Sequence, residues 1–372
     1  MNQTITNALK NSNQSKDERT VSFYRLQDPE QLSAFTLLLQ QHPGIKISDE
    51  LTCQLLELIK SRHPTERLTD DALEQMVAAH LGDTPAEAYG VWVYYPWSSR
   101  MVHLLDETEF IELRTSRNKQ KITTAEREQL QTRKIGVIGL SVGQSVAIAL
   151  AIERLCGELR IADFDRLELS NMNRVRTSVH TIGILKTVMV AREIAEIDPF
   201  LPVICYDSGI TENNINDFLI NGGKLDILVE ECDSLDIKIL SRLKARELRI
   251  PVVMDTSDRG MIDVERFDLN PDRPILHGRI PDEVTPEVIR NMQGPERMQM
   301  VDRIVDIKSL SSKMQASLQE IGKTISTWPQ LSSAVMLGGA AIAHVCREIG
   351  LDHPMDSGRY YVDIEQIFNY HQ

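Results

Sequence analysis

Short apolar runs alternate with longer amphipathic runs through the middle of the chain. The runs KIGVIG, ELRIADFD, VICYDS, LDILVEECD and PVVMDTS have the length and residue types of strands. Between them, VAIALAIERL, LKTVMVAREIAEI, TENNINDFLI and LDIKILSRLKAREL carry apolar residues at helical spacing. Strands and helices that alternate in this way form βαβ units with right-handed crossovers. The pattern therefore predicts an α/β fold with a mostly parallel sheet flanked by helices.

The segments on either side of this region have different patterns. Before it, DELTCQLLELIK predicts a helix from Asp49 to Lys60, capped by Ser48 or Asp49, and TDDALEQM begins a second helix over 70–81. The runs YGVWVYY and RMVHLL, separated by PWSS, predict a hairpin. After the predicted sheet, MIDVERFDL predicts a further strand that could run antiparallel. The tail from Pro281 is mainly helical, and its small-residue stretch SAVMLGGAAIAHVCREIG is expected to pack on the sheet.

These patterns divide the chain into four parts. They are a polar, disordered tail over 1–20, a small N-terminal α+β domain over 21–112, a Rossmann-like domain over 113–280 and a mainly helical C-terminal extension over 281–372. Only the third part carries a pattern from which chemistry can be inferred.

Composition narrows the class of protein. The chain has 372 residues and a formal net charge of −13, and this acidic balance argues against a general nucleic-acid binder. No apolar run reaches the ~18 residues that a membrane helix needs, and the polar N-terminus lacks the apolar core of a secretory signal. The five cysteines are far apart and form no C-x-x-C pair, which argues against structural zinc and suits a reducing compartment. We expect a cytoplasmic protein with no zinc, no nucleic-acid partner and no membrane association.

A glycine-containing turn joins the first predicted strand of the sheet to the helix that follows it. The turn reads Gly139-Leu-Ser141-Val-Gly143, and small residues there let the backbone approach phosphates at a helix N-terminus. Asp163 follows at the end of the next strand, at about the ~20-residue distance expected of an acid that accepts hydrogen bonds from ribose. The turn therefore predicts a nucleotide site, which would fit a dinucleotide-dependent oxidoreductase equally well.

The same turn contains the string G-x-S-x-G of the hydrolase nucleophile elbow. In that alternative Ser141 is the nucleophile, Asp255 is the acid, and His277 or His344 is the base. Neither histidine has a local signature. An acidic pair at the end of the next strand also has no role in a hydrolase, so the nucleotide interpretation explains more of the sequence.

A second group of polar residues lies beyond the ribose acid and favours nucleotidyl transfer. The segment DFDRLELSNMNR supplies Asp165, Asn171 and Arg174, and the strings GILK and EECD supply Lys186 and Asp233. Arginine and lysine offset the charge that builds on an α-phosphate and on departing pyrophosphate. A carboxylate after the fourth strand can hold Mg²⁺. Taken one at a time these residues could be helix caps or surface residues, but one nucleotide site explains all of them.

Residues ~112–270 resemble the ThiF/MoeB family, the bacterial relatives of ubiquitin-activating enzymes. The resemblance is carried by the glycine-containing turn, by D-x-D-x-x-x-x-S-N-x-x-R, by G-x-x-K and by a strand that ends in an acidic pair. It implies ribose binding by Asp163 with Asp165 beside it, nucleotide binding by Gly139, Ser141, Gly143 and Asn171, phosphate contact by Arg174 and Lys186, and Mg²⁺ binding by Asp233. It also implies an arginine that reaches the phosphates, often from the partner subunit, and the string RTSRN places it at Arg117.

The resemblance implies an ATP- and Mg²⁺-dependent adenylyltransferase that activates a carboxylate as an acyl adenylate. The implied substrate is the C-terminus of a peptide or of a small ubiquitin-like or sulfur-carrier protein, and the implied assembly is a homodimer. Three positions depart from the family pattern: Ser141 and Gln144 stand where glycine is usual, and Ser234 follows Asp233 where asparagine is usual. The flanking regions resemble a subgroup in which such a domain precedes a nitroreductase-like flavin domain. A nucleotide-binding pseudo-enzyme that partners such a domain is therefore the alternative.

Overall fold

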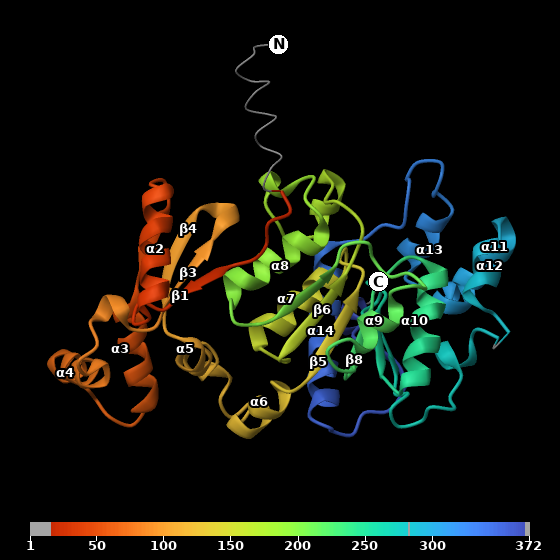
Figure 1. The fold of residues 1–372 in the computed structure, drawn as a ribbon. Helices are drawn as coiled ribbons and strands as arrows, with labels where there is room; N and C mark the ends of the chain where they lie inside the picture. The colour runs from red at the N-terminus through yellow and green to blue at the C-terminus, as the bar shows by residue number, and fades with distance from the viewer. Residues whose placement is uncertain (1–15, 282, 369–372) are drawn as a thin grey trace, which may run out of the picture. The chain divides into compact units, whose positions relative to one another are not determined.

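The computed structural model describes residues 16–281 and 283–368. The disordered tail predicted over 1–20 therefore lies mainly outside the described residues. The chain forms two compact units, Met1–Thr124 and Ala125–Gln372, which Figure 1 colours from red to orange and from yellow to blue. Each unit contains a sheet of its own.

The first unit is built on a four-stranded sheet. In spatial order its strands are β1 Ser22–Tyr24, β3 Val91–Tyr95, β4 Arg100–Leu104 and β2 Lys46–Asp49. Its helices are α2 Pro29–Gln41, α3 Leu51–Arg62, α4 Asp70–Leu81 and α5 Glu107–Arg114. The strands β3 and β4 are antiparallel neighbours, which confirms the predicted hairpin.

The predicted start of α3 is wrong, but Asp49, one of the two predicted caps, accepts a hydrogen bond on Oδ1 from the Leu51 N–H at 3.2 Å. Ser48 and Asp49 belong to the parallel ladder between β2 and β4, so the chain is still a strand where the helix was expected to begin. The helix begins at Leu51, and its N-cap Glu50 makes no side-chain capping hydrogen bond. By contrast, α4 has its predicted bounds, because the side chain of Thr69 caps it.

The second unit contains a seven-stranded sheet whose central strands are parallel. In spatial order the strands are β11 Gly358–Tyr361, β10 Met261–Glu265, β9 Val252–Asp255, β8 Ile227–Glu230, β5 Lys134–Ile138, β6 Glu158–Ala162 and β7 Val203–Tyr206. The strands β5 to β9 pair in parallel, and β10 runs antiparallel to β9, as the sequence suggested. The predicted α/β class with a mostly parallel sheet is confirmed.

The mainly helical tail contains one strand that the hydrophobic pattern does not indicate. The four-residue strand β11 pairs antiparallel with β10 at the edge of the sheet. Its Arg359 Nε donates to Asp263 Oδ2 of β10 at 2.7 Å. This strand is specified by its neighbour in space, which lies far from it in the sequence.

From Thr124 onward, helices and short turns connect the strands. The helices are α6 Thr124–Leu130, α7 Gly143–Glu153, α8 Lys186–Ile197, α9 Ile215–Ile220, α10 Leu235–Leu248, α11 Pro286–Asn291, α12 Gly294–Val305, α13 Ser312–Leu318, α14 Ser332–Gly350 and α15 Ile364–Ile367. Among the described residues, no helix has both the length and the apolar character to cross a membrane.

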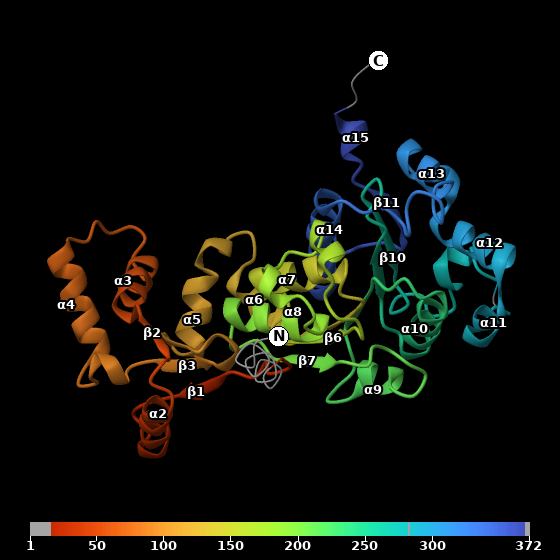
Figure 2. The ribbon, with the colours of Figure 1, turned by 90° about the horizontal axis from the view of Figure 1, so that it is seen from above.

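Helices cover both faces of this sheet (Figures 1 and 2). On β5, a Cβ atom at Gly136 would meet the ring of Phe218 in α9 at 2.9 Å. The next residue, Val137, faces the other way, and a Cβ atom at Gly143 of α7 would meet it at 2.7 Å. Successive residues of a strand point to opposite faces, so α9 and α7 lie on opposite sides of the sheet.

The predicted packing of the small-residue stretch on the sheet is confirmed. The helix α14 lies against α7 and β9. A Cβ atom at Gly338 would come within 1.9 Å of the Asp255 carboxylate, and one at Gly339 would come within 2.6 Å of Ser145 Oγ. Residues without a side chain are needed here because the helix approaches both elements so closely.

Candidate functional site

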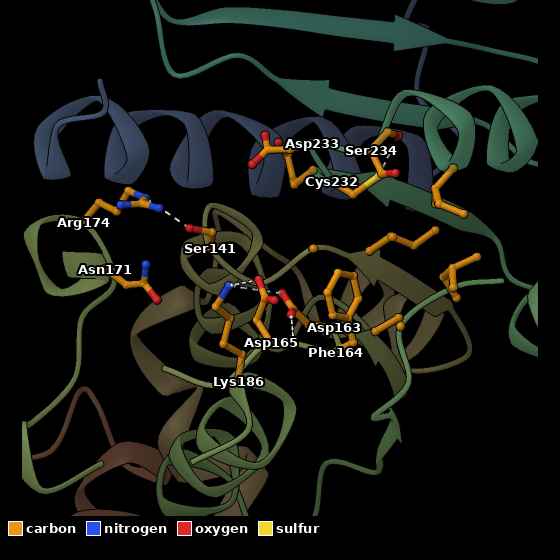
Figure 3. Close-up of a pocket in the computed structure, with 17 residues that line it drawn as sticks. Ser141, Asp163, Phe164, Asp165, Asn171, Arg174, Lys186, Cys232, Asp233 and Ser234 are labelled. Carbon is orange, nitrogen blue, oxygen red and sulfur yellow. Dashed lines mark hydrogen bonds and ion pairs between the residues drawn. The ribbon is translucent and has the colours of Figure 1, made fainter. Parts of the chain in front are cut away.

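A pocket of about 220 Å³ lies at the carboxyl ends of β5, β6 and β8 (Figure 3). These strands are neighbours in the sheet, so the residues that follow them meet at one edge. The pocket is lined by Ile138, Gly139, Ser141, Ala162, Asp163, Phe164, Asp165, Asn171, Arg174, Lys186, Gly209, Ile210, Glu231, Cys232, Asp233, Ser234 and Ile237. Ligands of open α/β sheets bind at this edge.

The glycine turn that follows β5 forms the floor of this pocket. Gly139 has a φ of +85°, and a Cβ atom there would lie 2.8 Å from the carbonyl group of Glu231. Only glycine combines this left-handed conformation with so close an approach to the turn after β8. The helix α7 begins a few residues later at Gly143.

Asp163 follows β6 and holds the glycine turn. Its Oδ2 accepts a hydrogen bond from the Leu140 N–H at 2.7 Å, and its Oδ1 accepts one from the Asp165 N–H at 2.8 Å. Burial raises the pKa of Asp163, and the nearby Lys186 charge and the two N–H groups oppose that rise. A carboxylate has about four acceptor positions, so Asp163 keeps the capacity to accept further hydrogen bonds.

Lys186 is the first residue of α8 and is almost completely buried. Its Nζ donates to Asp165 Oδ2 at 2.8 Å and lies 3.9 Å from Asp163 Oδ2. A buried ammonium group therefore stands beside two carboxylates at one end of the pocket.

Arg174 lies across the glycine turn from Lys186 (Figure 3). Its Nε donates to Ser141 Oγ at 3.1 Å, and its Nη1 donates to Asn173 Oδ1 at 3.0 Å. Burial lowers the pKa of Arg174, and the charge of Asp233 opposes this effect. The guanidinium group remains positively charged in any case, so Arg174 adds a second cation to the pocket, while Lys186 is paired with Asp165.

Gln144, which stands where the family usually has glycine, is directed away from the pocket. Its Oε1 accepts a hydrogen bond from the Arg176 N–H at 2.9 Å. Its Nε2 donates to the Arg176 carbonyl at 2.6 Å and to Glu193 Oε2 at 2.9 Å. Gln144 is therefore a buried connection between α7, the loop after Arg174 and α8. Of the departures from the family pattern, Ser141 and Ser234 line the pocket and Gln144 does not.

Asp233 lies in the turn between β8 and α10, which spans residues 231–234. The sequence placed Cys232 inside a strand, which is wrong, because β8 ends at Glu230. In the described part of the chain the Asp233 carboxylate makes no hydrogen bond. Burial, together with the charge of Glu230, raises the pKa of Cys232 well above its usual value, so this cysteine is a thiol and not a nucleophilic thiolate.

The structure brings most of the predicted site residues together. Gly139, Ser141, Asp163, Asp165, Asn171, Arg174, Lys186 and Asp233 all line the pocket, and Gly143 lies at the start of the helix beneath it. Arg117 belongs to the first unit, in the short turn Ser116–Asn118.

Sequence reasoning missed the apolar end of the pocket. Phe164, Ile210 and Ile237 line it, and Phe164 is 69% exposed. Phe164 stands between two predicted site acids, which was a usable signal. Ile210 follows β7 and Ile237 lies in α10, and neither has a local pattern that distinguishes it from a core residue.

The residues of the hydrolase alternative are engaged elsewhere. His277 Nε2 lies 3.0 Å from Asp263 Oδ1, and its Nδ1 lies 2.7 Å from Arg273 Nη2. His344 Nδ1 lies 2.7 Å from Arg347 Nη2. Ser141 Oγ accepts its hydrogen bond from an arginine, which is not a base. This arrangement does not support a Ser–His pair.

Metal-binding groups were sought over the ranges that the structure describes. No group of three or more His, Cys, Asp or Glu residues there could hold a metal ion by itself. A metal at Asp233 would therefore need ligands from a bound molecule.

Comparison with known proteins identifies a family. The model of the ThiF family matches residues 115–310. An uncharacterized protein of Mycobacterium tuberculosis is 42% identical over 273 residues, which are 73% of this chain and 38% of that protein. The Bombyx mori ubiquitin-like modifier-activating enzyme 5 is 26% identical over 129 residues, 32% of this chain and 33% of that protein. The Bacillus subtilis tRNA threonylcarbamoyladenosine dehydratase is 28% identical over 156 residues, 41% of this chain and 60% of that protein. The chain thus spans less than two thirds of each relative.

Proposed function

This chain belongs to the ThiF family, and we propose that it is an ATP-dependent adenylyltransferase that activates a carboxylate. The observation that carries the proposal is the polarity of the pocket. Arg174 and Lys186 supply two cations that can meet phosphates, and Phe164 and Ile237 supply apolar side chains that can meet a base. A nucleoside triphosphate has the same polarity, with a base at one end and phosphates at the other.

The order of the lining residues suggests how ATP would lie. The base would contact Phe164 and Ile237, and the ribose would lie near Asp163 on the carboxyl side of β6. The phosphates would extend over the glycine turn toward Arg174 and Lys186. The turn fits this role because its glycine allows close backbone approach, and α7 begins directly after it.

Asp233 fits a magnesium ion that arrives with the nucleotide. Mg²⁺ in phosphate sites is commonly held by one or two carboxylates together with phosphate oxygens and water. Asp233 lines the pocket and faces the charge of Arg174. The bound ion would offset negative charge on the phosphates.

The proposed reaction needs no general base. The substrate carboxylate is already ionised near neutral pH. Its oxygen forms a bond to the α-phosphorus while the bond between that phosphorus and the bridging oxygen to the β-phosphate breaks. The products are an acyl adenylate and pyrophosphate. Arg174 and Lys186 would stabilise the charge that develops on the phosphates, which is the main source of rate in this kind of transfer.

The proposed substrate is the C-terminal carboxylate of a peptide or small protein. Support comes from the Bombyx mori relative, whose name describes an activating enzyme for a ubiquitin-like modifier. The name of the Bacillus subtilis relative describes a tRNA base instead. A threonylcarbamoyl group carries a carboxylate, as a protein C-terminus does, so both names are compatible with the proposed activation of a carboxylate.

ATP–pyrophosphate exchange tests the proposal. We expect ATP with Mg²⁺ to raise the melting temperature, since a ligand at 100 times its Kd stabilises a protein by about 2.7 kcal/mol. We expect exchange of labelled pyrophosphate when peptides with free C-termini are supplied. We expect no exchange with the same peptides amidated at the C-terminus, because these lack the carboxylate. Stabilisation by NAD⁺ or a flavin without any effect of ATP would refute the proposal in favour of a dinucleotide enzyme.

A further inference from the structure

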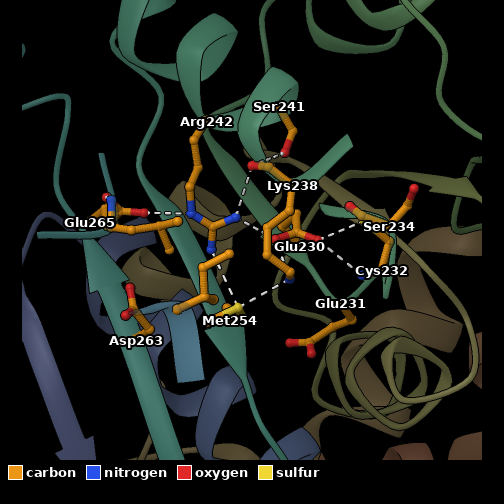
Figure 4. Close-up of polar contacts among 12 residues, drawn as sticks. Glu230, Glu231, Cys232, Ser234, Lys238, Ser241, Arg242, Met254, Asp263 and Glu265 are labelled. Atoms are coloured by element: carbon orange, nitrogen blue, oxygen red, sulfur yellow. Dashed lines mark hydrogen bonds and ion pairs between the residues drawn. The ribbon is translucent and has the colours of Figure 1, made fainter. Parts of the chain in front are cut away.

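A cluster of charged side chains lies beside the turn that contains Cys232 and Ser234 (Figure 4). We define the buried ion cluster as Glu230 of β8, Lys238 and Arg242 of α10, and Glu265 of β10. Glu230, Arg242 and Glu265 have no exposed surface, and Lys238 is 8% exposed. None of the four lines the pocket, and the proposed reaction uses none of them.

A single carboxylate in this cluster connects both sides of the 231–234 turn. Glu230 Oε1 accepts a hydrogen bond from the Cys232 N–H at 3.0 Å and lies 2.9 Å from Cys232 Sγ. Glu230 Oε2 accepts hydrogen bonds from Lys238 Nζ at 2.7 Å and from Arg242 Nη1. The first contact is to the turn itself, and the second pair is to the helix that follows the turn. The turn is thus held at its beginning and its end.

The far side of the cluster is anchored in β10. Arg242 Nε donates to Glu265 Oε2 at 2.7 Å, and Glu265 Oε1 accepts the Leu276 N–H at 2.5 Å. The cluster contains two carboxylates and two cations, so its formal charges balance. Burial alone would raise the pKa of Glu230, but Lys238 and Arg242 outweigh burial and lower the pKa to about 2. Proton uptake therefore does not loosen the contacts of Glu230 near neutral pH.

We propose that Glu230 is a positioning residue that fixes the 231–234 turn and thereby places Asp233 at the pocket. Asp233 makes no hydrogen bond of its own among the described residues, so its place depends on the backbone that carries it. The Cys232 N–H, one residue away, is bound by Glu230. The role given to Asp233 rests on the proposed function, whereas the fixing of the turn does not.

The test compares Glu230→Gln with the matched control Glu265→Gln. Each replaces a fully buried carboxylate that pairs with Arg242, so each leaves a buried cation less compensated and lowers the melting temperature. Only Glu230 contacts the turn. In the protein without nucleotide, we expect hydrogen–deuterium exchange over 231–235 to be at least ~10-fold faster in Glu230→Gln and within ~2-fold of wild type in Glu265→Gln.

Activity supplies the second measurement. We expect Glu230→Gln to raise the Mg²⁺ concentration that half-saturates pyrophosphate exchange by ~10-fold. Added to Asp233→Asn, it should cause little further loss of the residual exchange, because Glu230 acts only through Asp233. Equal deuterium uptake in the two single variants would overturn the inference, as would losses that simply multiply. Where Glu230→Gln does not fold, Glu230→Asp keeps the charge but shortens the side chain that accepts the Cys232 N–H, and unchanged uptake over 231–235 in that variant would also overturn it. A wild-type protein without exchange activity would defeat the proposed function, while the deuterium result would still decide whether Glu230 positions the turn.

Discussion

Two arginines two positions apart meet different surroundings and allow a sharp comparison. Arg174 lines the pocket and donates to Ser141. The side chain of Arg176 is 57% exposed and pairs with Glu193 outside the pocket. We expect Arg174→Ala to lower ATP–pyrophosphate exchange by ~10²–10³-fold, the effect typical of losing one group that stabilises transition-state charge. We expect Arg176→Ala to change it by less than ~3-fold, because an exposed ion pair contributes little.

Melting temperatures provide the control for this pair. Neither arginine is part of the apolar core, so both variants should melt within a few degrees of wild type, as surface substitutions of less than ~0.5 kcal/mol do. Equal losses of exchange in the two variants would show that the loop matters only as a whole. Full activity in Arg174→Ala would remove it from the site.

At this scale the sequence could predict residue types at fixed spacing but not side-chain directions. Asp163, Asn171 and Lys186 were identifiable because one nucleotide motif contains them. The sequence could not show whether the Gln144 side chain would block the pocket. The direction of that side chain depends on hydrogen bonds to Arg176 and Glu193, which lie far from it along the chain. Nor did the sequence show the contact between Glu230 and Arg242, whose strength comes from burial.

The elements that build the pocket depend on one close approach between the turns after β5 and β8. Gly139 and Gly183 both have positive φ, +85° and +83°, but only Gly139 would bring a Cβ atom against backbone, at 2.8 Å. We expect Gly183→Ala to lower the free energy of unfolding by ~1 kcal/mol, the conformational cost alone. Gly139→Ala should lower it by ~2–4 kcal/mol, because the crowding adds ~1–3 kcal/mol to that cost. Urea denaturation measures both, and equal losses would contradict the structural role given to Gly139.

A second prediction concerns β9, where α14 covers Asp255. Burial raises the pKa of Asp255 to about 6, although the Ser257 N–H and hydroxyl oppose the rise. An unfolded aspartate titrates near ~3.9, so folding favours the protonated form. The stabilisation is complete below that pH and is lost as the pH rises through about 6. Two pKa units correspond to roughly 3 kcal/mol.

Asp255→Asn removes this titration, so the variant's melting temperature should vary less with pH than that of wild type between about pH 4 and 7. Some dependence should remain, because burial, which the substitution leaves in place, also raises the pKa of Glu231. If the melting temperatures of the two proteins change by equal amounts across this pH range, the Asp255 carboxylate titrates normally.

Periodicity predicted the central elements well because each satisfies its own pattern. The strands β5, β6, β8 and β9 are largely buried, β7 at the edge is an apolar run that is only partly buried, and α8 and α10 are amphipathic. The strand β2 was missed because all four of its residues are exposed. The strand β11 was missed for a related reason, since only pairing with β10 orders it. Edge strands of this kind depend on partners that a local window of sequence does not contain.

At the scale of the whole molecule, the family match extends over parts of both compact units. The family match begins at residue 115, inside the first unit, and ends at residue 310 in the second. The matched region therefore includes Arg117 together with the pocket residues. The family resemblance gives Arg117 a role at the phosphates, often of a partner subunit. A symmetric dimer is the commonest assembly of soluble proteins and would let each copy complete the other's site.

Mixing two inactive variants tests this arrangement. Arg117→Ala lacks the arginine but keeps its pocket, and Asp233→Asn lacks the pocket carboxylate but keeps the arginine. If Arg117 acts on the partner's pocket, a heterodimer has one site with both groups intact. Random mixing makes half of the dimers mixed, so roughly a quarter of wild-type pyrophosphate exchange should return. If Arg117 acts within its own chain, every site in the mixture lacks one group, and exchange stays at the level of the separate variants. Light scattering on the wild type gives the control, because a monomer at the assay concentration would exclude an arginine supplied by a partner.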